Sequence, residues 1–376
     1  MKGMRILVTG GAGFVGSHLV DELLRLGHTV RVVDALVPQV HGTAHTPKYL
    51  PKDDVEFLRA DVRKPQTWQR ALKGVRIVFH QAAEVGVGQS MYEITKYMEA
   101  NTLGTSLMWQ ELITGKYRVE KVLVASSMSV YGEGQYRCRE HGIVYPSLRS
   151  EAQLKRHDWE MHCPRCAAVV QSERTPEEKP LAPTSVYAIS KRDQEDLSLA
   201  LGRAYRIPTV ALRYFNIYGP RQSLSNPYTG VAAIFSSRLR SRKSPVVFED
   251  GRQSRDFIHI KDIVQANVVA MQRREADYDV FNVGTGVATT ILRLAQLLSE
   301  YLEVAIEPTV TGKFRAGDIR HCIADPSKLK ARLGCKPQVR FEQGLGDLVR
   351  WVQEEADVVD RVERATRELA IRGLVG

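Results

Sequence analysis

Short hydrophobic runs alternate with amphipathic segments over the first two thirds of the chain. The runs have the length of buried strands and lie at residues 5–8, 29–33, 55–58, 76–79, 121–125 and 209–212. Segments of helical length and spacing separate them. Strands that alternate with helices indicate a parallel sheet covered by helices on both faces, because a parallel connection needs a crossover. We therefore predict an α/β fold with a doubly wound parallel sheet.

The pattern changes after about Gly219, where loops rich in Pro and Gly and short helices begin. We predict a first domain over residues 1–219 and a smaller C-terminal lobe over 220–350, with some segments returning to the first domain. Residues 351–376 combine charged side chains with apolar ones at helical spacing, Val358 among them. We expect a terminal helix there that packs on the body of the protein rather than on a partner.

Composition and charge narrow the classes of function. Of the 376 residues, 43% are hydrophobic and 26% are charged, which is ordinary for a folded protein. The net charge of +10 favours an anionic partner, but the basic residues are scattered, so we expect no nucleic-acid partner. No apolar stretch approaches ~18 residues, so we expect no membrane span. Residues 1–8 resemble a buried strand rather than a signal peptide, and we expect a cytoplasmic location.

A glycine-rich turn follows the first hydrophobic run. Gly10 permits a tight turn, Gly13 allows the backbone to approach a pyrophosphate, and Gly16 allows close packing of helix on strand. The helix that follows would present free N–H groups to the phosphates. Asp34 ends the second run, where its carboxylate would accept from ribose hydroxyls and repel a 2′-phosphate. Because Ala35 follows and no arginine adjoins, the sequence predicts NAD rather than NADP.

Tyr187 and Lys191 are spaced so that they share one face of a helix. A phenol normally titrates near pH ~10, and a nearby ammonium and an oxidised nicotinamide favour the phenolate. Tyr and Lys at this spacing often occur by chance. Their weight comes from the hydroxyl-rich segment 126–132, at the end of a hydrophobic run, where a hydroxyl would bind the substrate oxygen opposite Tyr187.

With these residues in place, the chain resembles the extended short-chain dehydrogenases/reductases that act on nucleotide sugars. The resemblance covers about residues 4–350. It rests on motifs at 9–16, Asp61-Val62, His80-Gln81-Ala82-Ala83, 101–105, 213–220, 255–259 and 315–318, which occur in the order typical of the family. It implies a Rossmann domain with a smaller substrate-binding lobe, NAD as the cofactor, a nucleotide-diphosphate hexose as the substrate, and a homodimer.

The resemblance also implies roles for single residues. Those implied to bind NAD are Gly10, Gly13, Phe14, Val15, Gly16, Asp34, Asp61, Val62, Ala82, Ala83, Asn101, Tyr187 and Lys191. Those implied to carry catalysis are Ser127, Tyr187 as the base, and Lys191. Those implied to bind the substrate are Ser127, Asn216, Arg255, Arg315, Asp318 and Cys322. Asn101 would steady the active-site strand. The small Cys322 would leave room for a bulky sugar substituent, unless it is a buried cysteine with no selective role.

The two residues after Ser127 bear on the reaction. Sugar 4,6-dehydratases of the family carry Asp-Glu there, whereas this chain has Met128 and Ser129, which supply no acid for eliminating water. We therefore expect a 4-epimerase, which needs one base and one tightly held NAD. The alternatives are a 4-keto-6-deoxyhexose reductase or dehydrogenase, or a UDP-glucuronate-type epimerase or decarboxylase. A non-catalytic NAD-sensing protein is disfavoured by the intact Ser, Tyr and Lys.

The segment between Tyr131 and Tyr187 is far longer than in ordinary members of the family. We predict an inserted loop or lobe over about residues 133–180. The insert leaves the strand at the catalytic Ser and returns just before Tyr187. We therefore expect it to overhang the sugar site.

This insert contains Cys138, His141, Cys163 and Cys166. Cys-x-x-His with Cys-x-x-Cys fits a tetrahedral structural zinc site, and a metal would explain how a small insert folds. Rival ligands are His157 and His162. The other interpretations are a redox-active Cys163–Cys166 pair or unligated thiols. The odd total of five cysteines argues against a disulfide framework.

Overall fold

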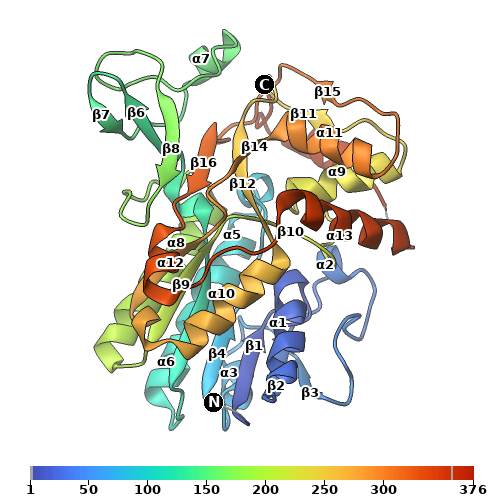
Figure 1. The fold of residues 1–376 in the computed structure, drawn as a ribbon. Helices are drawn as coiled ribbons and strands as arrows, with labels where there is room; N and C mark the ends of the chain where they lie inside the picture. Colours follow the sequence, from blue (N-terminus) through green and yellow to red (C-terminus); the bar gives the residue numbers. More distant parts are fainter. Residues whose placement is uncertain (1–2, 357–358) are drawn as a thin grey trace.

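The computed structural model describes residues 3–356 and 359–376. The strands of its central sheet are β1 (Arg5–Thr9), β2 (Thr29–Asp34), β3 (Val55–Arg59), β4 (Ile77–His80), β5 (Lys121–Ser127), β9 (Thr209–Tyr214) and β13 (Asp279–Val283). All pair in parallel, in the order β13-β9-β5-β4-β1-β2-β3. The chain order reverses between β1 and β4, where such sheets open a crevice for ligands. The predicted doubly wound sheet is confirmed (Figure 1).

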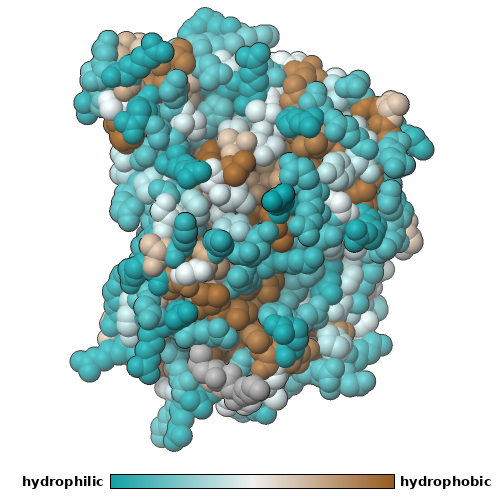
Figure 2. Space-filling model, in the orientation of Figure 1, coloured by the Kyte–Doolittle hydropathy of each residue, from teal (hydrophilic) through white to brown (hydrophobic). Residues whose placement is uncertain are grey.

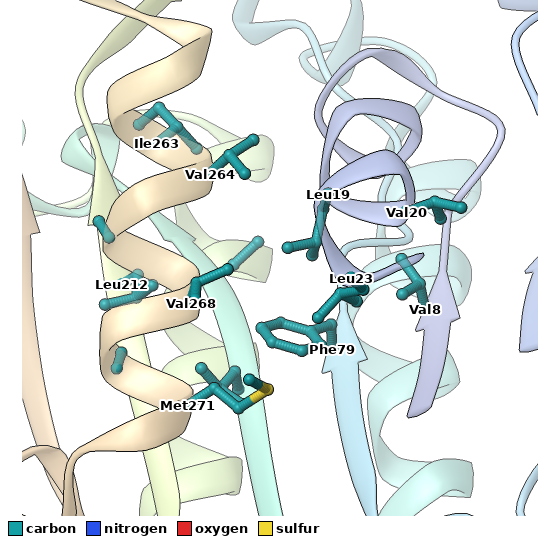
Figure 3. Close-up of a cluster of buried hydrophobic side chains, with 14 of the residues drawn as sticks. Val8, Leu19, Val20, Leu23, Phe79, Leu212, Ile263, Val264, Val268 and Met271 are labelled. Carbon is teal, nitrogen blue, oxygen red and sulfur yellow. The ribbon is translucent and has the colours of Figure 1, made fainter. Parts of the chain in front are cut away.

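Helices cover both faces of this sheet, and the central strands bury both of their sides. In β1, Ile6 and Val8 face one hydrophobic cluster, while Leu7 faces another. The first cluster lies under α1 (Phe14–Arg25) and α10 (Ile260–Gln272), whose apolar side chains meet beside Phe79 (Figure 3). The second lies under α3 (Pro65–Ala71) and α6 (Gly104–Thr114). Each fully buried aliphatic side chain contributes about 1.5–3 kcal/mol.

A second sheet lies over one end of the first (Figure 1). Its strands, in order, are β10 (Asn216–Tyr218), β12 (Ser254–His259), β16 (His321–Ala324), β8 (Gln171–Thr175), β6 (Gln135–Cys138) and β7 (Gly142–Val144), with β14 (Ala288–Thr290) also paired to β12. The predicted insert supplies β6, β7 and β8. It therefore extends the second sheet, because β8 pairs with β16 in parallel register.

Helices α9 (Val231–Arg240), α11 (Ile291–Tyr301) and α13 (Phe341–Glu354) enclose a separate core beside this sheet. The remaining elements are α2 (Pro38–His41), α4 (Val87–Ser90), α5 (Ile94–Tyr97), η1 (Met98–Leu103), η2 (Met128–Tyr131), α7 (Glu151–Lys155), α8 (Val186–Tyr205), β11 (Val246–Val247), η3 (Arg274–Ala276), β15 (Thr309–Val310), α12 (Ser327–Leu333) and α14 (Val362–Ile371). Within the described ranges, no helix is both long and apolar enough to span a membrane. The face in Figure 2 is mostly hydrophilic, with hydrophobic patches that are broadest in the lower half of the view.

The single terminal helix predicted over residues 351–376 is wrong in extent. Its first residues belong to α13, which ends at Glu354, and α14 is a separate helix. Asp360 marks the new start, because its Oδ1 accepts from Val362 N at 3.0 Å while Arg238 Nη1 donates to its Oδ2 at 3.3 Å. Val358 lies outside the described residues. Ala365 and Leu369 of α14 are buried.

Candidate active site

A cavity of about 670 Å³ lies where the central strands end. One part of its wall comes from the glycine-rich turn, the ends of β2, β4 and β5, and the first turns of α8. The other part comes from β10, α9, residues 315–319 and α14. The cavity therefore joins the two sheets at the switch point of the first.

The glycine-rich turn leaves no space for side chains at two of its positions. Gly10 has φ +67°, and a Cβ on it would lie 2.8 Å from Ala82 N. A Cβ on Gly16 would lie 2.2 Å from Gly10 O, so α1 packs closely on the turn itself rather than on a strand. Gly13 lines the cavity directly before α1, and Phe14 and Val15, the first residues of α1, line it too. This arrangement fits a pyrophosphate at the N-terminus of a helix.

Asp34 stands at the cavity end of β2. Its Oδ2 accepts from Ala12 N at 3.0 Å and its Oδ1 accepts from Leu36 N at 2.9 Å, which fixes the carboxylate. His41 Nε2 lies 3.7 Å from Oδ1. Burial lowers the pKa of His41, an effect that outweighs the attraction of Asp34, so the ring is neutral at pH 7. An uncharged imidazole beside Asp34 offers no cation to a 2′-phosphate.

The other predicted cofactor residues differ in their placement. Asp61, Val62, Ala82 and Ala83 all line the cavity. Asn101 does not appear among the described lining residues and is fully buried in the π-helical turn η1. Its side chain holds Glu84 and α8 rather than the active-site strand, which corrects the prediction.

Ser127, Tyr187 and Lys191 all line the cavity, as predicted from their spacing. Ser127 ends β5, and its Oγ accepts from Ser129 Oγ at 2.8 Å. Tyr187 and Lys191 lie in the first turns of α8, which Ser185 caps by accepting from Ala188 N at 3.1 Å. The structure thus brings a hydroxyl, a phenol and an amine from two elements to one wall.

Burial shapes the protonation of the two α8 groups. It raises the pKa of Tyr187, while the neighbouring Ser127 hydroxyl lowers it. Burial lowers the pKa of Lys191 to about 7. A buried phenol becomes an effective base only when a cation stands beside it, and the Lys191 ammonium is the group placed to supply that charge.

A buried polar chain continues from Lys191 toward the glycine-rich turn. Lys191 Nζ donates to Gln194 Oε1 at 2.7 Å, and Gln194 Nε2 donates to Thr105 Oγ1 at 2.9 Å. His80 contacts Thr105 Oγ1 at 3.0 Å and Thr9 Oγ1 at 2.8 Å. Burial lowers the pKa of His80 to about 3, so this ring is neutral. Sequence reasoning missed Gln194 because Thr105 and His80, its partners besides Lys191, come from other elements.

The predicted substrate residues gather on the opposite wall. Asn216 lines the cavity, and its Oδ1 is buried without a hydrogen-bond partner among the described residues. Arg255 is fixed by donating to the carbonyls of Ile319 at 2.8 Å and Arg320 at 3.1 Å. Arg315 Nε donates to Asp318 Oδ2 at 2.8 Å, and both line the cavity. An unsatisfied buried amide oxygen on the same wall as the half-buried Arg255 and the exposed Arg315 is the pattern of a polar ligand site.

The prediction for Cys322 is wrong. It is fully buried in a cluster with Tyr131 and Phe215, and the described cavity lining does not include it. Burial raises the pKa of its thiol to about 12. Ile319 reaches the cavity from the same segment. Cys322 is therefore the buried cysteine of the alternative interpretation.

The comparisons with known proteins agree with this geometry. The model of the NAD dependent epimerase/dehydratase family matches residues 6–150 and 163–284. The chain belongs to this family. A dTDP-L-rhamnose 4-epimerase from Burkholderia thailandensis is 38% identical over 359 residues, covering 95% of this chain and 97% of the relative.

Two solved structures also match. The UDP-glucose 4-epimerase of Thermotoga maritima with UDP-glucose has a TM-score of 0.77 and 31% identity, covering 93% of this chain and 99% of that one. The UDP-glucose 4-epimerase of Thermus thermophilus with NAD has a TM-score of 0.75 and 30% identity, covering 94% of this chain and 100% of that one. The protein is thus an NAD-dependent enzyme of the sugar epimerase type.

This member of the epimerase/dehydratase family has cavity residues that its motifs did not reveal. Gln222 and Gln253 each bring a buried side-chain oxygen without a partner among the described residues. Arg63, Arg221 and Arg238 line the cavity in addition to Arg255 and Arg315. From α14 the lining gains Val362, Ala365, Thr366 and Leu369. No sequence signal pointed to them, because tertiary folding alone brings them to the site.

The insert does not overhang this cavity, contrary to the prediction, because the described lining includes nothing from residues 133–180. The four predicted metal ligands do lie together elsewhere in the insert. Cys138, His141, Cys163 and Cys166 each place one ligand atom within 4.8 Å of the others. The family model leaves residues 151–162, inside the insert, unmatched.

Proposed function

We propose that the protein is an NAD-dependent 4-epimerase of a nucleotide-diphosphate hexose. The observation that carries the proposal is the position of Ser127, Tyr187 and Lys191. They lie on one cavity between a glycine-rich turn and a second polar wall that contains Asn216 and Arg255. One half of this cavity suits a dinucleotide, and the other suits a second diphosphate.

The cofactor half would hold NAD through the chain's own groups. The turn around Gly13 would receive the pyrophosphate, Asp34 the adenosine ribose, and Lys191 the nicotinamide ribose. When bound, NAD supplies the hydride acceptor that takes hydrogen from C4 and later returns it. The buried chain from Lys191 through Gln194 would keep the amine oriented during this exchange.

The proton would move through Tyr187. Its phenolate oxygen would accept the proton of the C4 hydroxyl, while Ser127 Oγ would hydrogen-bond the same oxygen. The Lys191 ammonium would stabilise the phenolate and oppose the effect of burial on its pKa. Because the proton stays on Tyr187, the same residue would return it when the opposite face of the keto sugar is reduced. One base therefore serves both half-reactions.

The substrate half would fix the nucleotide and leave the sugar free to turn. Arg255 and Arg315 would bind the diphosphate, Asn216 would contact it, and Asp318 would accept from the nucleoside ribose. Rotation of the keto sugar needs anchoring at the diphosphate and space at the hexose. These residues lie apart from Ser127 and Tyr187 in the sequence and come from β10, β12 and the segment before β16.

The alternatives differ in proton and hydride balance. Met128 and Ser129 line the cavity where a dehydratase needs carboxylic acids, which disfavours elimination of water. A reductase or dehydrogenase would consume external NAD(H), and a UDP-glucuronate-type decarboxylase would release CO₂. Similarity to a dTDP-L-rhamnose 4-epimerase favours inversion at C4. A homodimer and a cytoplasmic location stay predictions.

Incubation with a panel of UDP-, dTDP- and GDP-sugars tests the proposal, with dTDP-L-rhamnose and UDP-glucose first. We expect a C4 epimer to appear by NMR without added NAD(H) and to approach the same ratio from either epimer. Turnover only with stoichiometric NAD(H), or release of CO₂, would contradict the proposal and favour the corresponding alternative.

A further inference from the structure

The insert carries four soft metal-binding side chains on two turns. Cys138 closes β6, and His141 lies in the turn that leads to β7. Cys163 and Cys166 lie on a second turn, where Ala167 N donates to Cys163 O at 2.9 Å. We call these four residues the Cys₃His cluster. None of these four residues is among the described residues that line the substrate cavity.

Three of the six separations within the Cys₃His cluster match a tetrahedral zinc site, and all six lie within 4.8 Å. Cys138 Sγ lies 3.6 Å from His141 Nδ1 and 3.7 Å from Cys166 Sγ, and Cys163 Sγ lies 3.6 Å from His141 Nδ1. Zinc bonds of about 2.3 Å to sulfur and about 2.0–2.1 Å to nitrogen give tetrahedral edges of about 3.8 Å for S···S and about 3.6 Å for S···N. A disulfide needs about 2.05 Å, and these cysteines are free.

The rival histidines are engaged elsewhere. His162 Nε2 lies 2.9 Å from the Asp158 carboxylate, and its Nδ1 lies 2.9 Å from Ala167 O. His157 stacks on Trp159 with ring centroids 5.2 Å apart. The cluster therefore has one imidazole and three thiols. Arg165 N also donates to Cys163 Sγ at 3.5 Å, the kind of outer contact that orients a metal ligand.

The insert has little apolar core without a metal. Its hydrophobic cluster contains six buried side chains: Tyr136, Cys138, Val144, Met161, Cys163 and Val170. Two of these side chains, Cys138 and Cys163, also belong to the Cys₃His cluster. So small a core supports a fold of this size only with an additional cross-link, such as a bound metal. A metal that binds only the folded form stabilises that form by its binding free energy.

We propose that Cys138, His141, Cys163 and Cys166 bind one structural Zn²⁺, which holds the insert against the wall of the substrate cavity. Three thiolates and a neutral imidazole complete four-coordination, so no position stays open for a substrate. Thiolate donors select zinc over magnesium or calcium, which prefer oxygen.

The insert reaches the residues behind the cavity wall through one buried and one partly exposed ion pair. Arg320 is fully buried, and its Nη2 donates to Glu160 of the insert at 2.6 Å. Arg149 of the insert donates to Glu249 at 2.8 Å and to Asp318 O at 3.3 Å. The Arg320 carbonyl in turn accepts from Arg255, which lines the cavity. The effect on substrate rests on the proposed function, whereas zinc binding does not.

Elemental analysis of the full-length protein, purified without added chelator, tests the metal. We expect about one zinc per chain in the wild type and below about 0.2 in Cys163→Ser, since loss of one of four ligands opens the site. Cys335→Ser is the matched control, because Cys335 is a buried cysteine in the central core, and it should keep full zinc. Wild-type protein below about 0.2 equivalents, full occupancy by iron, or unchanged zinc in Cys163→Ser would overturn the site.

A second measurement uses the wild-type protein and therefore tests the metal site even if the Cys163→Ser variant fails to fold. Wild-type protein is titrated with an organomercurial while a chromogenic chelator reports released zinc. We expect zinc release in step with the reaction of the three cluster thiols. Thiols that react freely without releasing zinc would overturn the proposal.

The link to the cavity is tested on the zinc-depleted protein. Calorimetry should show UDP or dTDP binding weakened by about tenfold, or about 1.4 kcal/mol, with NAD affinity changed less than about twofold. This readout needs the proposed nucleotide site but no turnover, so its outcome is separate from whether the enzyme inverts C4. Unchanged nucleotide binding, or equal loss of NAD binding, would overturn the link between zinc and the cavity wall.

Discussion

Asn101 Nδ2 donates to Ser190 Oγ at 2.9 Å, and Ser190 lies between Tyr187 and Lys191 on α8. The same amide group accepts from Glu84 N at 2.8 Å and donates to Glu84 O at 3.1 Å. One buried side chain thus joins the loop after β4 to the helix that carries the proposed base. Its position inside a π-helical turn is typical of functional sites.

Asn101→Ala should lower both stability and turnover. Loss of the amide leaves the backbone of Glu84 unpaired, at a cost of roughly 1–3 kcal/mol in the free energy of unfolding. The freed start of α8 should reduce kcat by about tenfold or more, with little change in NAD affinity. Urea denaturation and steady-state kinetics provide the check. Asn101→Asp, which keeps an acceptor for Glu84 N, should lose less stability; wild-type kcat in both variants would remove Asn101 from this role.

The buried Lys191 should make stability depend on pH. Its pKa falls from 10.5 to about 7 on folding because burial disfavours the ammonium. Between these pKa values the unfolded chain binds more protons than the folded protein. The loss in free energy of unfolding caused by burying Lys191 is therefore full at or below pH ~7 and shrinks as the pH rises. In NAD-free protein, Lys191→Met should therefore be more stable than wild type at pH 7, by a margin that narrows by about 2 kcal/mol at pH 9. Equal margins at both pH values in urea denaturation would refute this.

Asp34→Ala should weaken NAD binding by about tenfold or more, or about 1.4 kcal/mol, and NADP binding much less. The substitution removes an acceptor for the ribose hydroxyl and also the charge that repels a 2′-phosphate. The neutral His41 beside it supplies no compensating cation. Isothermal calorimetry of the wild type and of Asp34→Ala with NAD and with NADP measures these affinities. Tighter binding of NADP than NAD by the wild type would contradict the cofactor assignment.

The sequence was sufficient wherever local physics decides the structure. Strands buried on both faces appear as continuous apolar runs, and all six predicted runs became strands of the central sheet. Tight steric demands at Gly10 and Gly16 show directly as glycines. The helical spacing of Tyr187 and Lys191 placed both groups on one wall of the cavity.

Prediction failed where distant contacts decide. The side chain of Cys322 faces a buried cluster because β16 fixes its direction, and that strand depends on pairing with β12 and β8. Asp360, just before α14, pairs with Arg238 of α9, which is distant in the sequence. The insert joined the second sheet through the β8–β16 pairing rather than covering the sugar site.

Tyr187→Phe should abolish turnover, by about 10³-fold or more, with NAD affinity retained, because it removes the proton acceptor and keeps the ring. Tyr97→Phe is the matched control. Its ring packs edge-on against Tyr187 with centroids 6.4 Å apart, and its hydroxyl donates to Gln89 Oε1 at 3.1 Å, away from the reacting group. It should keep kcat within about tenfold of wild type. Comparable activity in the two variants would mean that Tyr187 is not the base.

The most direct test of C4 inversion follows deuterium placed at C4 of a nucleotide sugar that the enzyme converts. Direct return of the same hydride by a retained cofactor requires the label to stay at C4 of the inverted product, in ordinary water and without added NAD(H). NMR of the product at equilibrium should therefore show full retention of deuterium at C4. Loss of the label to solvent, or inversion at another carbon with C4 unchanged, would contradict the account.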